Sequence, residues 1–69
     1  MKLSARNVLP GTVVEIVTGA VTSHVRIDLG GSIVTAAITN DAVKELGLAV
    51  GSRASAVIKA SDVMVGVDE

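Results

Sequence analysis

The absence of both cysteine and aromatic residues is the feature that most limits how this chain can fold. Of its 69 residues 49% are hydrophobic, but none is Phe, Trp, Tyr or Cys. A domain this small gains barely enough from apolar burial to offset its conformational entropy, so small domains usually need disulfides, a structural metal or association between subunits. Without cysteine there is no disulfide or thiolate site, and one histidine cannot build a metal site alone. We therefore expect a single domain that forms a homo-oligomer.

The charge balance argues against two classes of partner. Six Lys and Arg residues against seven Asp and Glu give a formal net charge of −1. Proteins that neutralise phosphates are normally basic, and those that stack unpaired bases need aromatic rings, so we expect no nucleic-acid partner. No apolar run approaches the roughly 20 residues that span a bilayer, and the first residues lack the apolar core of a signal peptide. We expect a cytoplasmic protein with no membrane partner.

β-Branched residues that recur with a period of two predict strands along most of the chain. The runs that fit a strand lie at residues 11–18, 21–29, 32–39 and 53–59. In the first run, Val13, Glu15 and Val17 are expected to share one face. In the second and third, Val25, Ile27 and Leu29, and then Val34, Ala36 and Ile38, are expected to point inward, on either side of a hairpin turn at Gly30-Gly31.

One short helix is expected between the third and last strands. Thr39 or Asn40 can cap its N-terminus, Asp41 complements the dipole in the first turn, and Gly47 can end it. A short apolar tail, Val63-Met64-Val65, follows the last strand. We interpret the pattern as a mainly β protein with five short strands, arranged as an OB-like Greek-key barrel with one helix that plugs one end.

No set of residues fits a catalytic site. His24 is the only imidazole, and the adjacent Ser23 cannot join it in a catalytic group, because consecutive strand side chains point to opposite faces. Asp41 and Glu45, one helical turn apart, are typical of a solvated helix face. The glycines match neither a dinucleotide-binding nor a phosphate-binding loop. We expect no enzyme activity, no cofactor and no directly bound metal cation.

Hydrogen-bond donors gather in two segments that contain no carboxylate. Ser4-Ala5-Arg6-Asn7 combines a hydroxyl, a guanidinium and an amide, while Lys59-Ala60-Ser61 adds an ammonium group and a hydroxyl; Thr39 adds a further hydroxyl beside the expected helix start. Charged donors and oriented backbone amides suit a small oxyanion. The alternative is that Arg6 and Lys59 are ordinary surface charges and Ser4 a turn residue, and spacing alone favours this alternative.

Three segments, in order, carry a resemblance to a known family. They are Ser4-Ala5-Arg6-Asn7-Val8-Leu9-Pro10-Gly11, then Ala37-Ile38-Thr39 with Ala42-Val43 and Leu46-Gly47-Leu48, and finally Ala56-Val57-Ile58-Lys59-Ala60-Ser61 with Asp62-Val63-Met64. The chain resembles the molbindins, or Mop domains, which are small bacterial molybdate-binding proteins. The resemblance covers nearly all of the chain and implies one Mop domain over residues 1–69. It also implies an OB-like fold and a homohexamer built as a trimer of dimers.

The resemblance further implies that molybdate or tungstate binds between subunits. The implied oxyanion ligands are Ser4 and Arg6 of one subunit with Thr39, Lys59, Ala60 and Ser61 of a neighbour; further candidates are Ala5, Asn7 and His24, the last for a second class of site near a three-fold axis. The expected function is binding and storage of the oxyanion in the cytoplasm, for molybdenum homeostasis. The alternative is a non-catalytic structural or protein-interaction module with the same fold and no anion.

Overall fold

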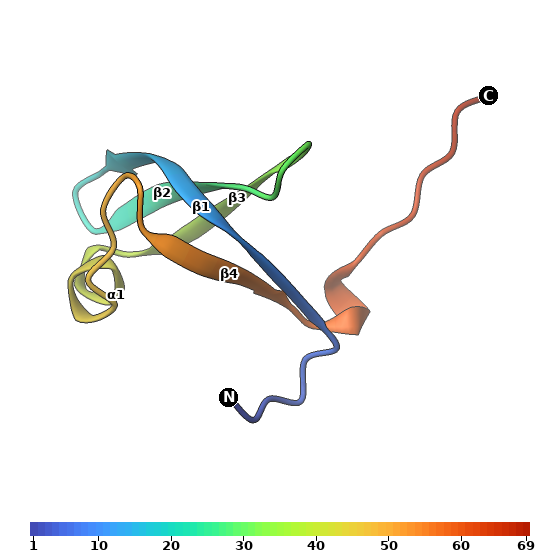
Figure 1. Ribbon diagram of the computed structural model, residues 1–69, viewed down its shortest axis with the longest axis horizontal. Helices are drawn as coiled ribbons and strands as arrows, with labels where there is room; N and C mark the ends of the chain where they lie inside the picture. Colours follow the sequence, from blue (N-terminus) through green and yellow to red (C-terminus); the bar gives the residue numbers. More distant parts are fainter.

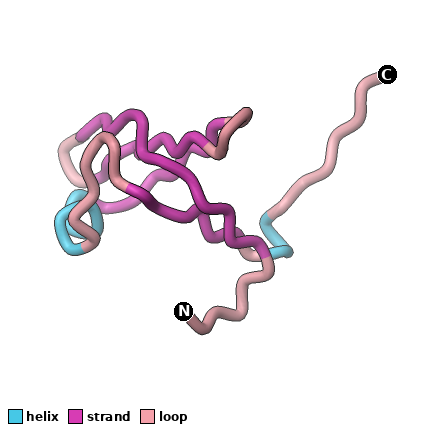
Figure 2. Tube along the Cα trace, in the orientation of Figure 1, coloured by secondary structure: helices cyan, strands magenta, loops and turns pink.

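The computed structural model describes all 69 residues as a curled, four-stranded antiparallel sheet with one short helix (Figures 1 and 2). In chain order the elements are β1 (Asn7–Thr18), β2 (Thr22–Asp28), β3 (Ile33–Thr39), α1 (Asn40–Glu45), β4 (Arg53–Ile58) and the 3₁₀ turn η1 (Ala60–Asp62). The strand order is β3-β2-β1-β4, so β3 and β4 are the two edges and each pairs on one side only. A membrane-spanning helix needs about 20 apolar residues, and neither helical segment of this chain approaches that length.

The expected number of five strands is wrong for this chain, because only four form. Residues 63–69 contain no strand, and they extend away from the sheet after η1 (Figure 1). The first strand also starts earlier than expected, at Asn7 instead of residue 11. Its first half pairs with β4, from Asn7 opposite Ile58 to Thr12 opposite Arg53, and its second half pairs with β2. The mainly β class and the single helix are confirmed.

A β-bulge in β1 corrects the expectation that Val13, Glu15 and Val17 share one face. The pairing with β2 shifts register between Val13 and Glu15, which inserts one extra residue and moves the following side chains to the other face. Val13 is fully buried, and the next inward position is Ile16, which packs against the core. Glu15 is exposed instead and forms an ion pair with Arg26 at 3.6 Å.

The core is small and lies on the concave side of the sheet. Its buried apolar members are Val13, Val25, Ile27 and Ala56, and two of the expected inward residues of β3, Val34 and Ile38, pack against them with partial exposure. Ser23 is the one buried polar residue; its hydroxyl donates to the Asn40 side-chain oxygen, and the Asn40 amide donates to the Gly19 carbonyl at 3.0 Å. This link fixes the start of α1 to β2.

The expected signals at both ends of the helix are confirmed. The Thr39 hydroxyl accepts a hydrogen bond from the Ala42 backbone N–H at 3.0 Å, which satisfies one free donor of the first turn. At the other end Gly47 has a φ of +63°, a conformation that a residue with a Cβ rarely adopts, and the chain leaves the helix there.

The folded chain exposes far more surface than a compact monomer of its size. Its accessible surface is 5283 Å², whereas a folded monomer of 6.9 kDa exposes about 4,000 Å². The excess is therefore roughly 1,300 Å². The exposed large hydrophobic residues are Met1, Leu3, Val8, Val14, Val17, Val21, Ile33, Leu46, Val50, Val57, Val63, Met64, Val65 and Val67. This surface supports an oligomer, since large exposed apolar patches usually mark interaction sites.

Two glycine substitutions test the crossing of β1 over β2. A Cβ at Gly11 would lie 2.8 Å from Ile27 Cγ2 and closer still to the Asp28 carbonyl oxygen, whereas a Cβ at Gly31 would have no atom within 4 Å. We expect Gly11→Ala to lower the free energy of unfolding by about 1–3 kcal/mol through overpacking. Gly31→Ala should leave it unchanged or slightly raised. Urea unfolding followed by circular dichroism measures both, and equal effects would contradict the packing described.

Candidate oxyanion site

Pairing of β1 with β4 brings the two donor segments to the same end of the sheet. Asn7 and Ile58 form the last pair of this ladder, and the Asn7 side-chain amide donates to the Ile58 carbonyl at 3.1 Å. Residues 4–6 and 59–61 therefore continue from adjacent strand ends, and Figure 1 shows both segments leaving the sheet there. Two segments that lie at least 53 positions apart in the sequence (59 − 6) therefore start from neighbouring strand ends.

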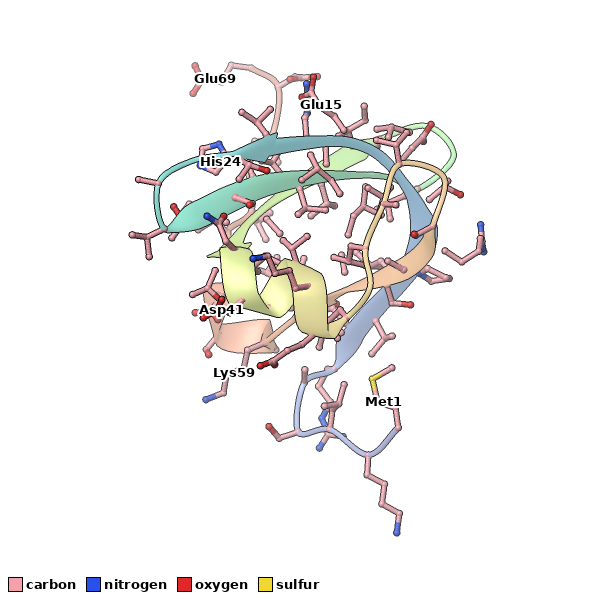
Figure 3. The ribbon with its side chains drawn as sticks, turned by 90° about the vertical axis from the view of Figure 1, so that its left-hand side faces the viewer. Met1, Glu15, His24, Asp41, Lys59 and Glu69 are labelled. Atoms are coloured by element: carbon pink, nitrogen blue, oxygen red, sulfur yellow. The ribbon has the colours of Figure 1, made fainter.

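The two cations of these segments have no carboxylate partner. Arg6 and Lys59 are both exposed, and the only ion pair in the structure joins Arg26 to Glu15. Figure 3 shows the Lys59 side chain pointing away from the body of the chain. Asp62 is the nearest carboxylate in sequence, but it forms no ion pair with either cation. Two positive groups without counter-charge at one end of the sheet can attract an anion.

The backbone at η1 adds neutral donors beside Lys59. Lys59 has an extended backbone and is the N-cap residue of η1, and its carbonyl accepts from the Asp62 N–H at 2.9 Å. The N–H groups that open such a turn have no partner within it, so those of Ala60 and Ser61 remain able to donate to a ligand. Ser4 and Ser61, both exposed, add hydroxyls at the same end.

Thr39 lies at the opposite end of the molecule from these donors. It ends β3 opposite Thr22 and caps α1, and Figure 1 shows α1 and η1 at opposite ends of the sheet. Because its hydroxyl oxygen accepts from Ala42, the Thr39 O–H proton remains able to donate to a ligand. One chain therefore does not bring Thr39 to Arg6 and Lys59, and a site with all three needs a second subunit.

The three further candidate residues are spread over the structure. Ala5 is half-buried beside Arg6, and the Asn7 amide is engaged with β4. His24 is exposed on the outer face of β2, opposite Val17 and Ala37, toward the α1 end (Figure 3). It therefore lies away from the Arg6 and Lys59 donors of its own chain.

Comparison with protein families defines the class of this protein. Residues 3–65 match the TOBE domain, and the chain belongs to this family. Over 69 residues it is 52% identical to a probable molybdenum-pterin-binding protein of Haemophilus influenzae, and the match covers 99% of this chain and 100% of that protein. The resemblance to molbindins is thus confirmed.

Solved structures agree with this placement. A molybdate-binding protein from Sporomusa ovata superposes with a TM-score of 0.92 at 42% identity, covering 97% of this chain and all of that one. The cytoplasmic molybdate-binding protein ModG, in a form with molybdate bound, superposes with a TM-score of 0.92 at 54% identity; the match covers 99% of this chain and 49% of ModG. The curled sheet with one short helix is therefore the OB-like fold of these proteins.

The cap on α1 can be tested with two substitutions at Thr39. Thr39→Val removes the oxygen that accepts from the Ala42 N–H, so we expect it to cost about 1 kcal/mol of unfolding free energy. Thr39→Ser retains the oxygen and should keep most of that stability. Thermal unfolding followed by circular dichroism compares the two variants. Equal stability of Thr39→Val and Thr39→Ser would show that the hydroxyl does not act as a cap.

Proposed function

We propose that this protein binds molybdate, without catalysis, at sites shared between subunits of a homo-oligomer. The observation that carries the proposal is the placement of Arg6 and Lys59, two unpaired cations, on adjacent strand ends with hydroxyl and backbone donors around them. The proposed ligands are Ser4, Arg6, Lys59, Ala60 and Ser61, with Thr39 supplied across an interface. The names of the relatives and solved structures support the same ligand.

The chemistry of the donor set favours a fully ionised tetrahedral anion. Molybdate and tungstate carry no proton at neutral pH, so each of their oxygens only accepts hydrogen bonds, and lysine and arginine side chains only donate. Phosphate carries a proton that neither these cations nor the backbone N–H groups can accept, so only a hydroxyl oxygen could pair with it, and a proton left unpaired in a dry site is costly. Sulfate is also unprotonated, so the site must discriminate against it by size, because its shorter bonds leave the donors too far away.

The oxyanion itself fits the residues better than a pterin that carries molybdenum. A planar pterin ring is normally held by stacking on aromatic side chains, and this chain has none. The donors at the β1–β4 end are instead cations, hydroxyls and backbone amides, which suit oxygen atoms. We therefore favour molybdate or tungstate as the ligand, although several relatives are named for molybdenum-pterin binding.

An oligomer is part of the proposal because one chain does not gather all of the ligands. Thr39 and Lys59 lie at opposite ends of the sheet, and roughly 1,300 Å² of surface exceeds what a compact monomer exposes. We propose a homohexamer, arranged as a trimer of dimers, in which residues 1–69 of each subunit form one Mop domain. Each bound anion would then join two subunits and stabilise the assembly by mass action.

The proposed role is storage and release of molybdate in the cytoplasm, for molybdenum homeostasis. ModG, which is described as cytoplasmic, supports the location. A second candidate is an interaction module that binds a protein through its exposed edges and holds no anion; the unpaired edges of β3 and β4 favour it. An assembly that forms normally but does not bind molybdate would favour this second candidate.

Removal of one guanidinium tests the proposed site directly. Arg6→Ala deletes a charged donor to the anion, which is worth about 1.5–3 kcal/mol, so we expect molybdate affinity to fall roughly 10- to 150-fold. Arg26→Ala is the matched control, because it removes the same charge from an exposed ion pair on the outer face of the sheet. Isothermal titration calorimetry with molybdate compares both with the unaltered protein.

Two results of this titration would contradict the proposed site. Unchanged affinity in Arg6→Ala would show that Arg6 is no ligand. An equal loss in Arg26→Ala would show that general charge, and no particular set of donors, governs binding.

A further inference from the structure

A side-chain hydrogen bond closes each end of the ladder between β1 and β4. At one end Asn7 and Ile58 are the terminal pair, and the Asn7 amide donates to the Ile58 carbonyl at 3.1 Å. At the other end Thr12 and Arg53 are the terminal pair, and the Arg53 guanidinium donates to the Thr12 hydroxyl oxygen at 3.2 Å. The ends of a ladder open more easily than its middle. Each bond therefore holds two strand ends together.

The bond made by Asn7 lies directly beside the proposed oxyanion ligands. Arg6 precedes Asn7 in the chain and Lys59 follows Ile58, so the bond joins the two residues from which the two cationic segments extend. Residues 4–6 and 59–61 belong to no strand, and no hydrogen bond joins one segment directly to the other. The relative position of the two cations is therefore set by the pair that Asn7 closes.

Asn7 is also a polar residue at an inward-facing position. Alternation along β1 places Asn7 on the same face as Leu9, which packs against the core, and Val13, which is fully buried. The Asn7 side chain is itself half-buried. An apolar residue is the usual choice on such a face, and residues that break the pattern of their own strand tend to mark functional positions. Packing alone therefore does not account for an amide here.

We propose that Asn7 is a positioning residue for the oxyanion site, and that it acts through Arg6 and Lys59 instead of touching the anion. Two cations on adjacent strand ends repel each other, and without an anion this repulsion tends to part the ends. The hydrogen bond opposes that separation, so the donors are arranged before the anion arrives and less ordering is needed on binding. The inference rests on the proposed function, since it takes both cations as ligands.

Replacement of the amide by an apolar side chain of similar size tests this role. Asn7→Leu removes the donor but suits the inward face, so we expect stability in urea to be kept while molybdate affinity falls about 3- to 10-fold. Asn7→Ala also lacks the donor and should lose affinity by a similar factor. Isothermal titration calorimetry measures the affinity of each variant.

The other end of the same ladder provides the matched control. Thr12→Val removes the hydroxyl that accepts from Arg53 and keeps the shape of the side chain, so it should leave molybdate affinity unchanged. An equal loss in Thr12→Val and Asn7→Leu would show that general loosening of the ladder lowers the affinity. That result, or unchanged affinity in both Asn7 variants, would overturn the proposal.

Backbone mobility in the anion-free protein shows whether Asn7 acts through the strand ends. NMR order parameters report the fast motion of each backbone N–H. We expect them to fall at residues 5–6 and 59–62 in Asn7→Leu and to stay unchanged there in Thr12→Val. Loss of a direct ligand would not change them, because its contact exists only when the anion is bound. Unchanged values in Asn7→Leu would therefore contradict a positioning role.

A double-mutant cycle with Arg6→Ala separates positioning from direct contact. If Asn7 acts by aligning Arg6 with Lys59, most of its effect disappears once the guanidinium is gone, so the two losses of affinity should not add. The Asn7 amide has a second N–H that could reach an anion directly. Additive losses would indicate such a contact and would refute the positioning role.

The order parameters also separate the failure of this inference from the failure of the proposed function. If the unaltered protein binds no molybdate but Asn7→Leu loosens residues 59–62, the proposed function is refuted and the role of Asn7 at the strand ends stands. If the unaltered protein binds molybdate and Asn7→Leu binds it equally well, the positioning role alone is refuted.

Discussion

An apolar interior that one chain leaves open is the constraint on which the rest of this structure depends. The sheet curls but does not close, so only Val13, Val25, Ile27 and Ala56 are buried among the apolar residues. Burial of one such aliphatic side chain contributes about 1.5–3 kcal/mol, and a core of four, with no aromatic ring or disulfide, is small. The uncovered side between β3 and β4 is therefore where further stability must come from, and a second copy of the chain can supply it.

The same arrangement links assembly to the anion. The candidate donors Lys59, Ala60 and Ser61 form the turn from which the C-terminal segment leaves the sheet, while Thr39 lies at the far end beside α1. Contacts that cover the open side of the sheet and contacts that complete the anion site would thus involve neighbouring parts of the chain. A bound dianion would neutralise two cations that otherwise repel each other across adjacent strand ends, so ligand and assembly should stabilise one another.

Local sequence signals predicted the regular parts of the fold, and tertiary pairing decided the rest. Periodicity predicts the inward residues of β2. Capping rules predict Thr39 at the start of α1 and Gly47 just after its end. The early start of β1 does not follow from these rules, because Pro10 lacks an N–H and is typical of a loop. The bulge after Val13 is also not predicted, since it interrupts an alternation that is regular in the sequence. The meeting of residues 4–6 with 59–61 depends on the β1–β4 register, which spacing alone could not reveal; the resemblance to molbindins pointed to it.

Native mass spectrometry with molybdate and with sulfate in matched excess tests the central claim most directly. It reports the number of chains and the bound anions together, and it needs no aromatic chromophore, which this chain lacks. The account predicts a hexamer that carries discrete added masses of molybdate and keeps them when sulfate is in excess. An assembly that carries no molybdate, or that loses it to sulfate, would contradict the account.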